Sequence, residues 1–204
     1  MLAAWLRAAL AALLMSIMPL AALAEPAGVL DGRHLSVEFQ VLTFGFWSVE
    51  GRFKDVSGEI APGRGEGAGR VRLKAAATSI DTGSLLRDAR LRSSDFFDAA
   101  NHPFVTFESI RATRDETGAG SILGNLSMRG ITNPITMDFK LECPRMKHAS
   151  RVELQPGRLV ASGSVRRSAW GMTALSAAVG DEVLLRLEAR VNPHQCASLL
   201  TNLR

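Results

Sequence analysis

The chain has 204 residues, 24 basic and 20 acidic side chains, a net charge of +4 at pH 7 and 47% apolar residues. This length and composition are enough for one domain with a sizeable core. The basic residues are scattered along the chain rather than gathered with aromatic residues into one patch, so nucleic acid is not an expected partner.

The first predicted element is a secretory signal peptide over residues 1–24. Arg7 supplies its positive charge, a long apolar run follows, and Pro19 interrupts that run before the small residues Ala22 and Ala24. An uncleaved membrane anchor is the alternative, but the uncharged run is only marginally long enough to span a bilayer and contains Pro19. We therefore expect cleavage after Ala24 and export of residues 25–204 as one domain.

Most of the remaining chain has apolar side chains at alternate positions, which is typical of strands with one buried face. The segments with this pattern are 34–41, 49–60, 70–77, 103–110, 121–128, 135–142, 159–165 and 183–190. Polar segments rich in glycine or proline separate several of them, for example 62–69 and 115–120. We predict an all-β fold, an antiparallel barrel of about eight strands. The chain has no Tyr, which disfavours an outer-membrane barrel with its aromatic girdles.

One stretch, residues 83–100, departs from the strand pattern. Leu85, Leu86 and Leu91 fall near one side at helical spacing, and Asp95 is placed to cap a following turn. We predict one or two short helices here, packed over a mouth or wall of the barrel.

Two cysteines remain after the signal segment, Cys143 and Cys196, and each follows a predicted strand near a proline. An even pair in an exported chain favours one disulfide, which would add about 4 kcal/mol of stability in the chain-entropy model. Two independent thiols are the alternative, and the sequence leaves both open. No spacing of Cys and His supplies the further ligands that a metal site needs.

No catalytic motif stands out, and we predict a protein that is not an enzyme and has no metal or cofactor. The four histidines lack zinc-site spacing, and nucleophile-elbow, phosphate-loop and dinucleotide motifs are absent. His34 and Ser36 share one strand face and could form a nucleophile–base pair, but polar decoration of a strand is the preferred interpretation.

Several motifs, in order, resemble those of the YceI-like family. They are Asp31-Gly32-Arg33-His34-Leu35-Ser36, Val49-Glu50-Gly51-Arg52-Phe53, Ser79-Ile80-Asp81-Thr82, Arg87-Asp88, Leu91-Arg92-Ser93, Asp95-Phe96-Phe97-Asp98, His102-Pro103, Gly124 to Thr132, Arg167-Ser168, Gly171-Met172 and Val179 to Val183. The likeness spans about residues 31–188. Three positions depart from the family pattern: Thr43 and Arg90 stand where histidines are common, and Ala169 replaces an aspartate.

The resemblance implies a lipocalin-like, eight-stranded barrel whose apolar lumen holds a long lipid, typically a polyisoprenoid or a related amphiphile. It also implies a periplasmic location and a part in isoprenoid carriage or stress adaptation rather than a defined reaction. The expected partner is the lipid itself, with transient membrane contact for loading and a homodimer as further candidates. The departures put recognition of the lipid head group in doubt.

An eight-stranded barrel is either filled by its own side chains or open enough for one ligand, and the sequence does not choose between the two. The candidate lumen-lining residues are Phe39, Phe44, Phe46, Trp47, Phe53, Phe96, Phe97, Phe104, Phe107, Met128, Met137, Trp170 and Met172. Ordinary core packing is the alternative for each of them.

The candidates for an anionic head group are Arg87, Arg92 and Arg167, since guanidinium groups bind phosphate and carboxylate in a bidentate manner. Intramolecular pairs, such as Arg87 with Asp88 or Asp95, are the alternative. Besides a lipid carrier, two other functions stay open: a quinone-linked redox accessory protein, and a stress or interaction module with a filled core.

Overall fold

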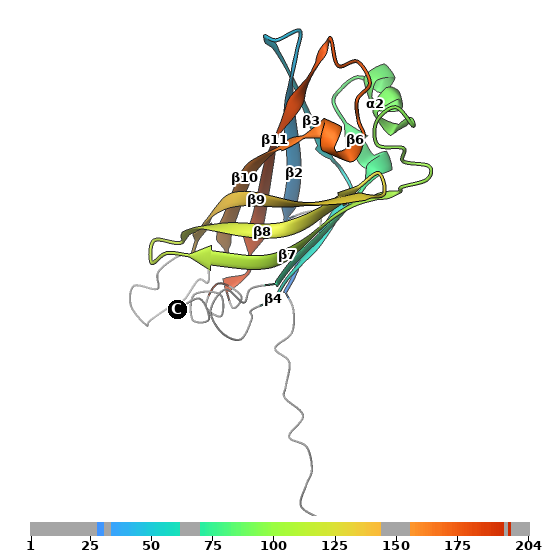
Figure 1. Cartoon of the computed structure of the whole chain (residues 1–204). Coiled ribbons are helices and arrows are strands. Elements are labelled where there is room, and N and C mark those ends of the chain that lie inside the picture. The colour runs from blue at the N-terminus through green and yellow to red at the C-terminus, as the bar shows by residue number, and fades with distance from the viewer. Residues whose placement is uncertain (1–27, 31–33, 62–69, 144–155, 194–195, 197–204) are drawn as a thin grey trace, which may run out of the picture.

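The computed structural model of the chain describes residues 28–30, 34–61, 70–143, 156–193 and 196 (Figure 1). The predicted signal segment and the glycine-rich loop 62–69 lie outside these residues. The strands are β1 (Gly28–Leu30), β2 (Leu35–Thr43), β3 (Trp47–Phe53), β4 (Val56–Ala61), β5 (Arg70–Ala76), β6 (Ile80–Asp81), β7 (Phe104–Arg114), β8 (Ala119–Met128), β9 (Ile131–Glu142), β10 (Gly157–Arg166) and β11 (Val179–Val191). The helical elements are α2 (Leu85–Arg92) and the 3₁₀ turns η1 (Ala77–Ser79) and η2 (Arg167–Trp170).

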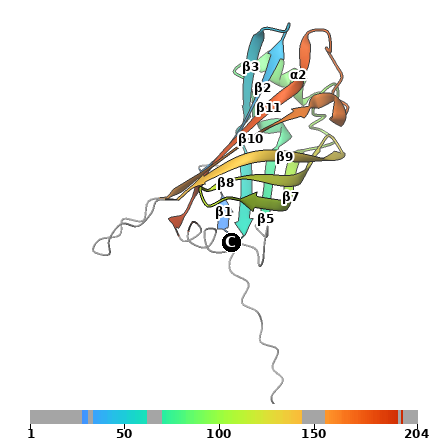
Figure 2. The same ribbon diagram turned by 60° about the vertical axis from the view of Figure 1, so that its left-hand side comes forward.

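All the strands belong to one antiparallel sheet in the order β1-β4-β5-β7-β8-β9-β10-β11-β2-β3-β6. β3 and β4 lie near opposite ends of this order, yet only Lys54 and Asp55 separate them in the chain. The sheet must therefore curl round until its two ends meet, as Figures 1 and 2 show. A hydrogen bond from Lys54 N to Ser79 O (3.1 Å) continues the β3–β6 pairing, and one from Ala76 N to Asp55 O (3.0 Å) continues the β4–β5 pairing on the other side of the bend.

The alternation seen in the sequence corresponds to the two faces of the curled sheet. In β9, Ile135, Met137 and Leu141 are buried, while Thr136 and Asp138 between them are exposed. The inward residues of the other long strands join one continuous apolar core. The predicted antiparallel all-β barrel is confirmed.

The number of strands differs from the predicted eight. The predicted strand at 49–60 is two strands, because the chain bends at Lys54 and Asp55 to pass from one end of the sheet to the other. β1 and β6 are short additional strands, each at one end of the sheet order.

The region 83–100 contains one helix, α2, followed by turns that lack a second helix. Its packing differs from the prediction: Leu85 and Leu86 are 86% and 87% exposed, and Leu91 alone of the three leucines packs against the core. Asp95 does not cap the next turn through its side chain; Phe96 N instead donates to Ser93 O at 3.1 Å. None of the described helices is long and apolar enough to cross a membrane.

Candidate functional site: the interior of the curled sheet

The inner face of the sheet lines a partly open cavity of about 70 Å³, and every described residue that lines it is apolar. The lining residues are Ile60, Val71, Leu73, Phe107, Ala112, Ile122, Met137, Phe139, Leu141, Leu159, Ala161 and Leu187. Pockets that hold small molecules usually measure about 300–1,000 Å³. The interior is thus a dry, apolar site that the protein's own side chains almost fill.

Glycines on the inner face explain how large side chains come to fill it. A Cβ atom at Gly51 would collide with the ring of Phe39, its cross-strand neighbour, and one at Gly124 would collide with the ring of Phe107. Gly163 stands in the same relation to Met137, whose Cγ would lie 3.1 Å from the added atom. The missing side chains leave room on the inner face, and rings or a thioether chain occupy it. The side chains of Phe39, Phe107 and Met137 can change rotamer, so the interior can open to a larger volume than its present cavity.

A line of aromatic rings continues the interior beyond the cavity. Phe39 and Phe53 have ring centroids 6.1 Å apart, and Phe53 meets Phe97 edge to face at 5.7 Å. These separations are typical of favourable aromatic pairs. Phe39 comes from β2, Phe53 from the neighbouring β3 and Phe97 from the segment after α2, so the line links this part of the sheet to the helical region.

Most of the predicted lumen residues face the interior. The inward group consists of Phe39, Phe53, Phe96, Phe97, Phe107, Met128, Met137, Trp170 and Met172, all in or packed against the core. Only Phe107 and Met137 of these line the cavity itself. The prediction considered aromatic residues and methionines alone and so missed the aliphatic wall, which the alternation of β5, β8 and β11 already indicated.

Four predicted lumen residues lie elsewhere. Phe44 and Phe46 are 70% and 78% exposed in the turn between β2 and β3, and Trp47, the first residue of β3, is 67% exposed at the edge of the inner face. The strand alternation stops there, because Phe44 and Gly45 both adopt a left-handed backbone. Phe104 is on the outer face of β7, where the Lys74 ammonium sits 3.6 Å from its ring centroid. Phe104 is three residues before the inward Phe107 on the same strand. Because successive side chains of a strand point to opposite faces, an odd separation already predicts that Phe104 faces outward.

Arg167, a predicted head-group ligand, is buried and engaged by the protein. Its guanidinium donates to the carbonyls of Met172 (2.5 Å), Ala174 (2.8 Å), Val179 (2.9 Å) and Gly180 (2.9 Å). These carbonyls belong to the connection between η2 and β11 and to the start of β11. Arg167 therefore fixes that connection, with four of its five N–H donors engaged by backbone carbonyls.

The other two predicted head-group residues also bind backbone. Arg87 donates to Oγ1 and O of Thr82, both at 2.8 Å. Arg92 donates to the carbonyls of Thr78 and Ile80, both at 2.8 Å. Both arginines therefore bind groups of the protein itself, as the alternative stated. Their acceptors are backbone and hydroxyl oxygens rather than the predicted carboxylates. No charged side chain lines the cavity.

A second hollow is lined by outward residues together with Phe39, Gly51 and Leu185, which hold inward positions on their strands. It is an open groove of about 990 Å³ over β9, β10, β11, β2, β3 and β6. One row of cross-strand neighbours runs along it, in the order Asp138, Ser162, Arg186, Glu38, Arg52 and Asp81. Lys54, whose Nζ lies 3.0 Å from Asp81, lowers the pKa of that carboxyl, with Arg52 adding to the effect. Opposite charges alternate along the row, so it supports pairing of the strands.

The described residues contain no group of three or more Cys, His, Asp or Glu side chains placed to hold a metal ion. His34 is exposed at the start of β2, and Ser36 is half-buried on the same strand. Neither adjoins the cavity.

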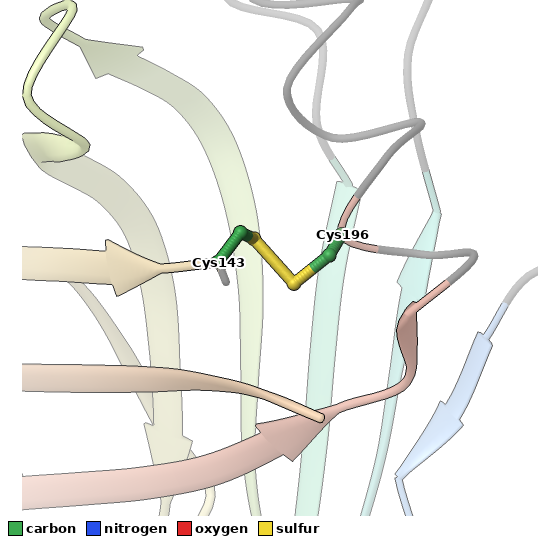
Figure 3. The surroundings of a disulfide bond; sticks show 2 residues. All are labelled: Cys143 and Cys196. Atoms are coloured by element: carbon green, nitrogen blue, oxygen red, sulfur yellow. A yellow bond between two sulfur atoms is a disulfide. The ribbon is translucent and has the colours of Figure 1, made fainter. Parts of the chain in front are cut away.

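A disulfide joins Cys143 to Cys196 (Figure 3), with Cα atoms 5.8 Å apart and a sequence separation of 53. The two cysteines are therefore bonded to each other rather than independent thiols, the two alternatives that the sequence left open. The bond lies just past the ends of β9 and β11, at the end of the barrel opposite the β2–β3 turn. We call this the disulfide end. Gly157 packs so closely here that a Cβ atom would collide with Cys196 Sγ.

Solved structures with the same fold are known. The chain aligns with BcnA of Burkholderia cenocepacia (TM-score 0.67, 19% identity, 80% of this chain and 99% of the other). It also aligns with a YceI protein of Campylobacter jejuni (TM-score 0.60, 21% identity, 71% and 84%). A third match is a polyisoprenoid-binding domain from Saccharophagus degradans implicated in plant cell wall breakdown (TM-score 0.57, 14% identity, 81% and 99%).

Curated sequences match over a shorter stretch. A UPF0312 protein of Pseudomonas aeruginosa and the protein YceI of Escherichia coli are each 34% identical over 112 residues. The match spans 54% of this chain and 58% of the length of these relatives. The YceI-like domain model matches residues 29–191, which include every described strand except the first residue of β1. The chain therefore belongs to the YceI-like family.

Proposed function

We propose that this protein binds a polyisoprenoid or a similar long-chain amphiphile inside its curled sheet. The observation that carries the proposal is the central cavity, whose twelve lining residues are all apolar and come from β4, β5 and β7 to β11. Membership of the YceI-like family and the fold shared with a polyisoprenoid-binding domain support the same ligand class. Such a site selects a ligand by its length and shape rather than by polar contacts.

The present cavity admits only a few methylene groups, so a long ligand must displace the side chains that now occupy the interior. Opening about 500 Å³ would cost roughly 12 kcal/mol at about 24 cal/mol per Å³. Burying about twenty methylene groups of a ligand contributes roughly 16 kcal/mol at about 0.8 kcal/mol each. The two quantities are similar, so a long chain can drive the opening and a short one cannot. We expect affinity to rise steeply with chain length.

The surroundings of such a ligand would be periplasmic. The predicted signal segment supports export, and the Cys143–Cys196 bond is the kind of link that oxidising compartments favour. The protein would act as a carrier or buffer for a lipid that is insoluble in water, loading it during transient contact with a membrane. Catalysis has no part in this proposal.

The small volume of the cavity also supports a second candidate, an interaction or stress module whose filled core never opens. A titration of the mature protein with prenols of increasing length separates the two. The carrier should show saturable uptake that strengthens with chain length, and lipid should appear in organic extracts of the purified protein. A filled module should show neither result.

Matched variants connect uptake to the interior. Ala161 lines the cavity on β10, and its neighbour Ser162 points to the outer face. Ala161→Phe should abolish prenol uptake, whereas Ser162→Phe should leave it within about twofold. Equal uptake by both variants, with the fold intact by circular dichroism, would place the ligand outside the sheet and contradict the proposal.

A further inference from the structure

Two segments at the end of the barrel opposite the disulfide carry no charged residue. They are 42–49, which contains the β2–β3 turn, and 171–180, which leads from η2 into β11. Charged residues make up 22% of the whole chain. Connections on a protein surface are normally polar because they are solvated, so eight and ten residues without a charge are unusual at such a place.

The two segments lie side by side. Phe44 N donates to Ala178 O at 2.7 Å, and Thr43 pairs with Val179 in the register of β2 and β11. Figures 1 and 2 both show the β2–β3 turn and the connection before β11 projecting together beyond the body of the sheet. We call residues 42–49 and 171–180 the aromatic end.

Large apolar side chains on the aromatic end are exposed to water. Phe44 and Phe46 lie in the turn, Trp47 directly follows it, and Leu42 and Leu175 are 48% and 46% exposed beside them. α2 lies towards the same end in both views and adds the exposed Leu85 and Leu86. A patch of this size on a soluble domain marks a site of contact with a protein or a membrane.

The aromatic end is held in place by the fold. The buried Arg167 binds four carbonyl oxygens of the connection that carries Leu175, and Trp170 Nε1 donates to Leu126 O at 3.1 Å directly before it. The exposed side chains are thus presented on an ordered scaffold, which lowers the entropy lost on docking.

The charges beside the aromatic end are mixed in sign. Glu50, Asp181 and Glu182 are exposed directly next to the two segments. On α2, the exposed Arg90 pairs with Asp95 at 3.3 Å. The uncharged tip is therefore bordered by charges of both signs and carries none itself.

We propose that the aromatic end docks on the surface of a lipid bilayer, with Phe44, Phe46 and Trp47 entering the interfacial layer. Trp and Phe favour this layer, and the segments that would enter it have no charge to desolvate. A bilayer interface takes up exposed Trp and Phe side chains together with the uncharged segments that carry them.

The aromatic end is continuous with the interior. Trp47 lies on the inner face of β3, followed inward by Val49 and then by Gly51, whose missing side chain admits the ring of Phe39. A lipid that leaves the bilayer at the turn would meet an unbroken apolar path to the core. This role in loading rests on the proposed function, although docking itself does not require it.

Flotation of the mature protein with phosphatidylcholine vesicles, and with vesicles that also contain phosphatidylglycerol, tests the proposal. We expect binding to both, equal within about twofold, because the tip itself is uncharged. The combined variant Phe44→Ser, Phe46→Ser, Trp47→Ser should bind at least tenfold more weakly. The control Ile110→Ser removes a 58% exposed side chain from β7, outside the aromatic end, and should bind within twofold of the parent.

The outcomes separate docking from lipid uptake. Absence of vesicle binding, or equal binding by the triple variant and the parent, would overturn the docking proposal. Self-association that the triple variant loses, without vesicle binding, would overturn it in favour of a second copy of the chain. Prenol uptake from detergent solution by the triple variant should match the parent, because these side chains lie outside the cavity. If neither the parent nor the triple variant takes up prenol, the proposed interior site is contradicted and the docking proposal is not.

Discussion

The two ends of the barrel are stabilised in opposite ways. At the disulfide end, a covalent bond and fully buried aliphatic side chains such as Ala189 and Val191 close the structure. At the aromatic end, a buried arginine organises the backbone while aromatic side chains remain in water. One end is therefore closed by covalent and apolar contacts, whereas the other leaves large apolar side chains exposed. Breaking each end separately should therefore have different consequences.

The largest expected effect comes from breaking the disulfide end. Changing Cys143→Ser and Cys196→Ser together should lower the free energy of unfolding by about 4 kcal/mol, because the unfolded chain is no longer constrained across the loop. Urea denaturation with and without a reducing agent measures this loss. The reducing agent should destabilise the parent and leave the double variant unchanged, and a parent insensitive to reduction would contradict the assignment. Vesicle binding should persist in the folded double variant.

The strands and the helix near 83–100 could be predicted from the sequence, because alternation of apolar residues directly reflects a two-faced sheet and its interruption marks the helix. The partners of Arg167 could not, because its four carbonyl acceptors follow from the path of a connection that no local pattern encodes. The turn aromatics were assigned to the lumen because composition does not reveal where alternation stops. The bend at Lys54 and Asp55 was missed because the apolar pattern continues through it from β3 to β4.

The second largest expected effect is a loss of stability at the aromatic end. Arg167→Met keeps much of the side-chain volume but leaves four carbonyls without their cationic donor, so we expect a loss of about 3 kcal/mol of stability. Hydrogen exchange should show earlier opening of residues 171–180 than of the strands near Cys143. Its neighbour Arg166 is exposed, and Arg166→Met should change stability by about 0.5 kcal/mol or less. Equal effects of the two substitutions would contradict the structural role of Arg167.

A smaller loss of stability should follow from adding a side-chain atom in the interior, between the disulfide end and the aromatic end. Gly51→Ala places a Cβ atom against the Phe39 ring and should cost about 2 kcal/mol as the ring is displaced. Adding Phe39→Leu should make the combined loss less than the sum of the two single losses, since the clash is relieved. Chemical denaturation of the four proteins gives the coupling energy. Strict additivity would show that Phe39 does not occupy the space at Gly51.

The smallest effect is on the pH dependence of the aromatic end. Asp181 accepts hydrogen bonds from the backbone N (2.9 Å) and Oγ (2.8 Å) of Ser168, and these bonds, with a smaller contribution from Arg167, lower its pKa. Because the folded pKa lies below the unfolded value of about 3.9, the stabilisation is present above that pH and is lost as the pH falls through the folded pKa. Parent and Asp181→Asn should therefore differ in stability at pH 7 and converge in acid below about pH 3.9. Ser168→Ala should raise the pKa of Asp181 towards its ordinary value in an NMR titration, and an unchanged titration would show that Ser168 is not its partner.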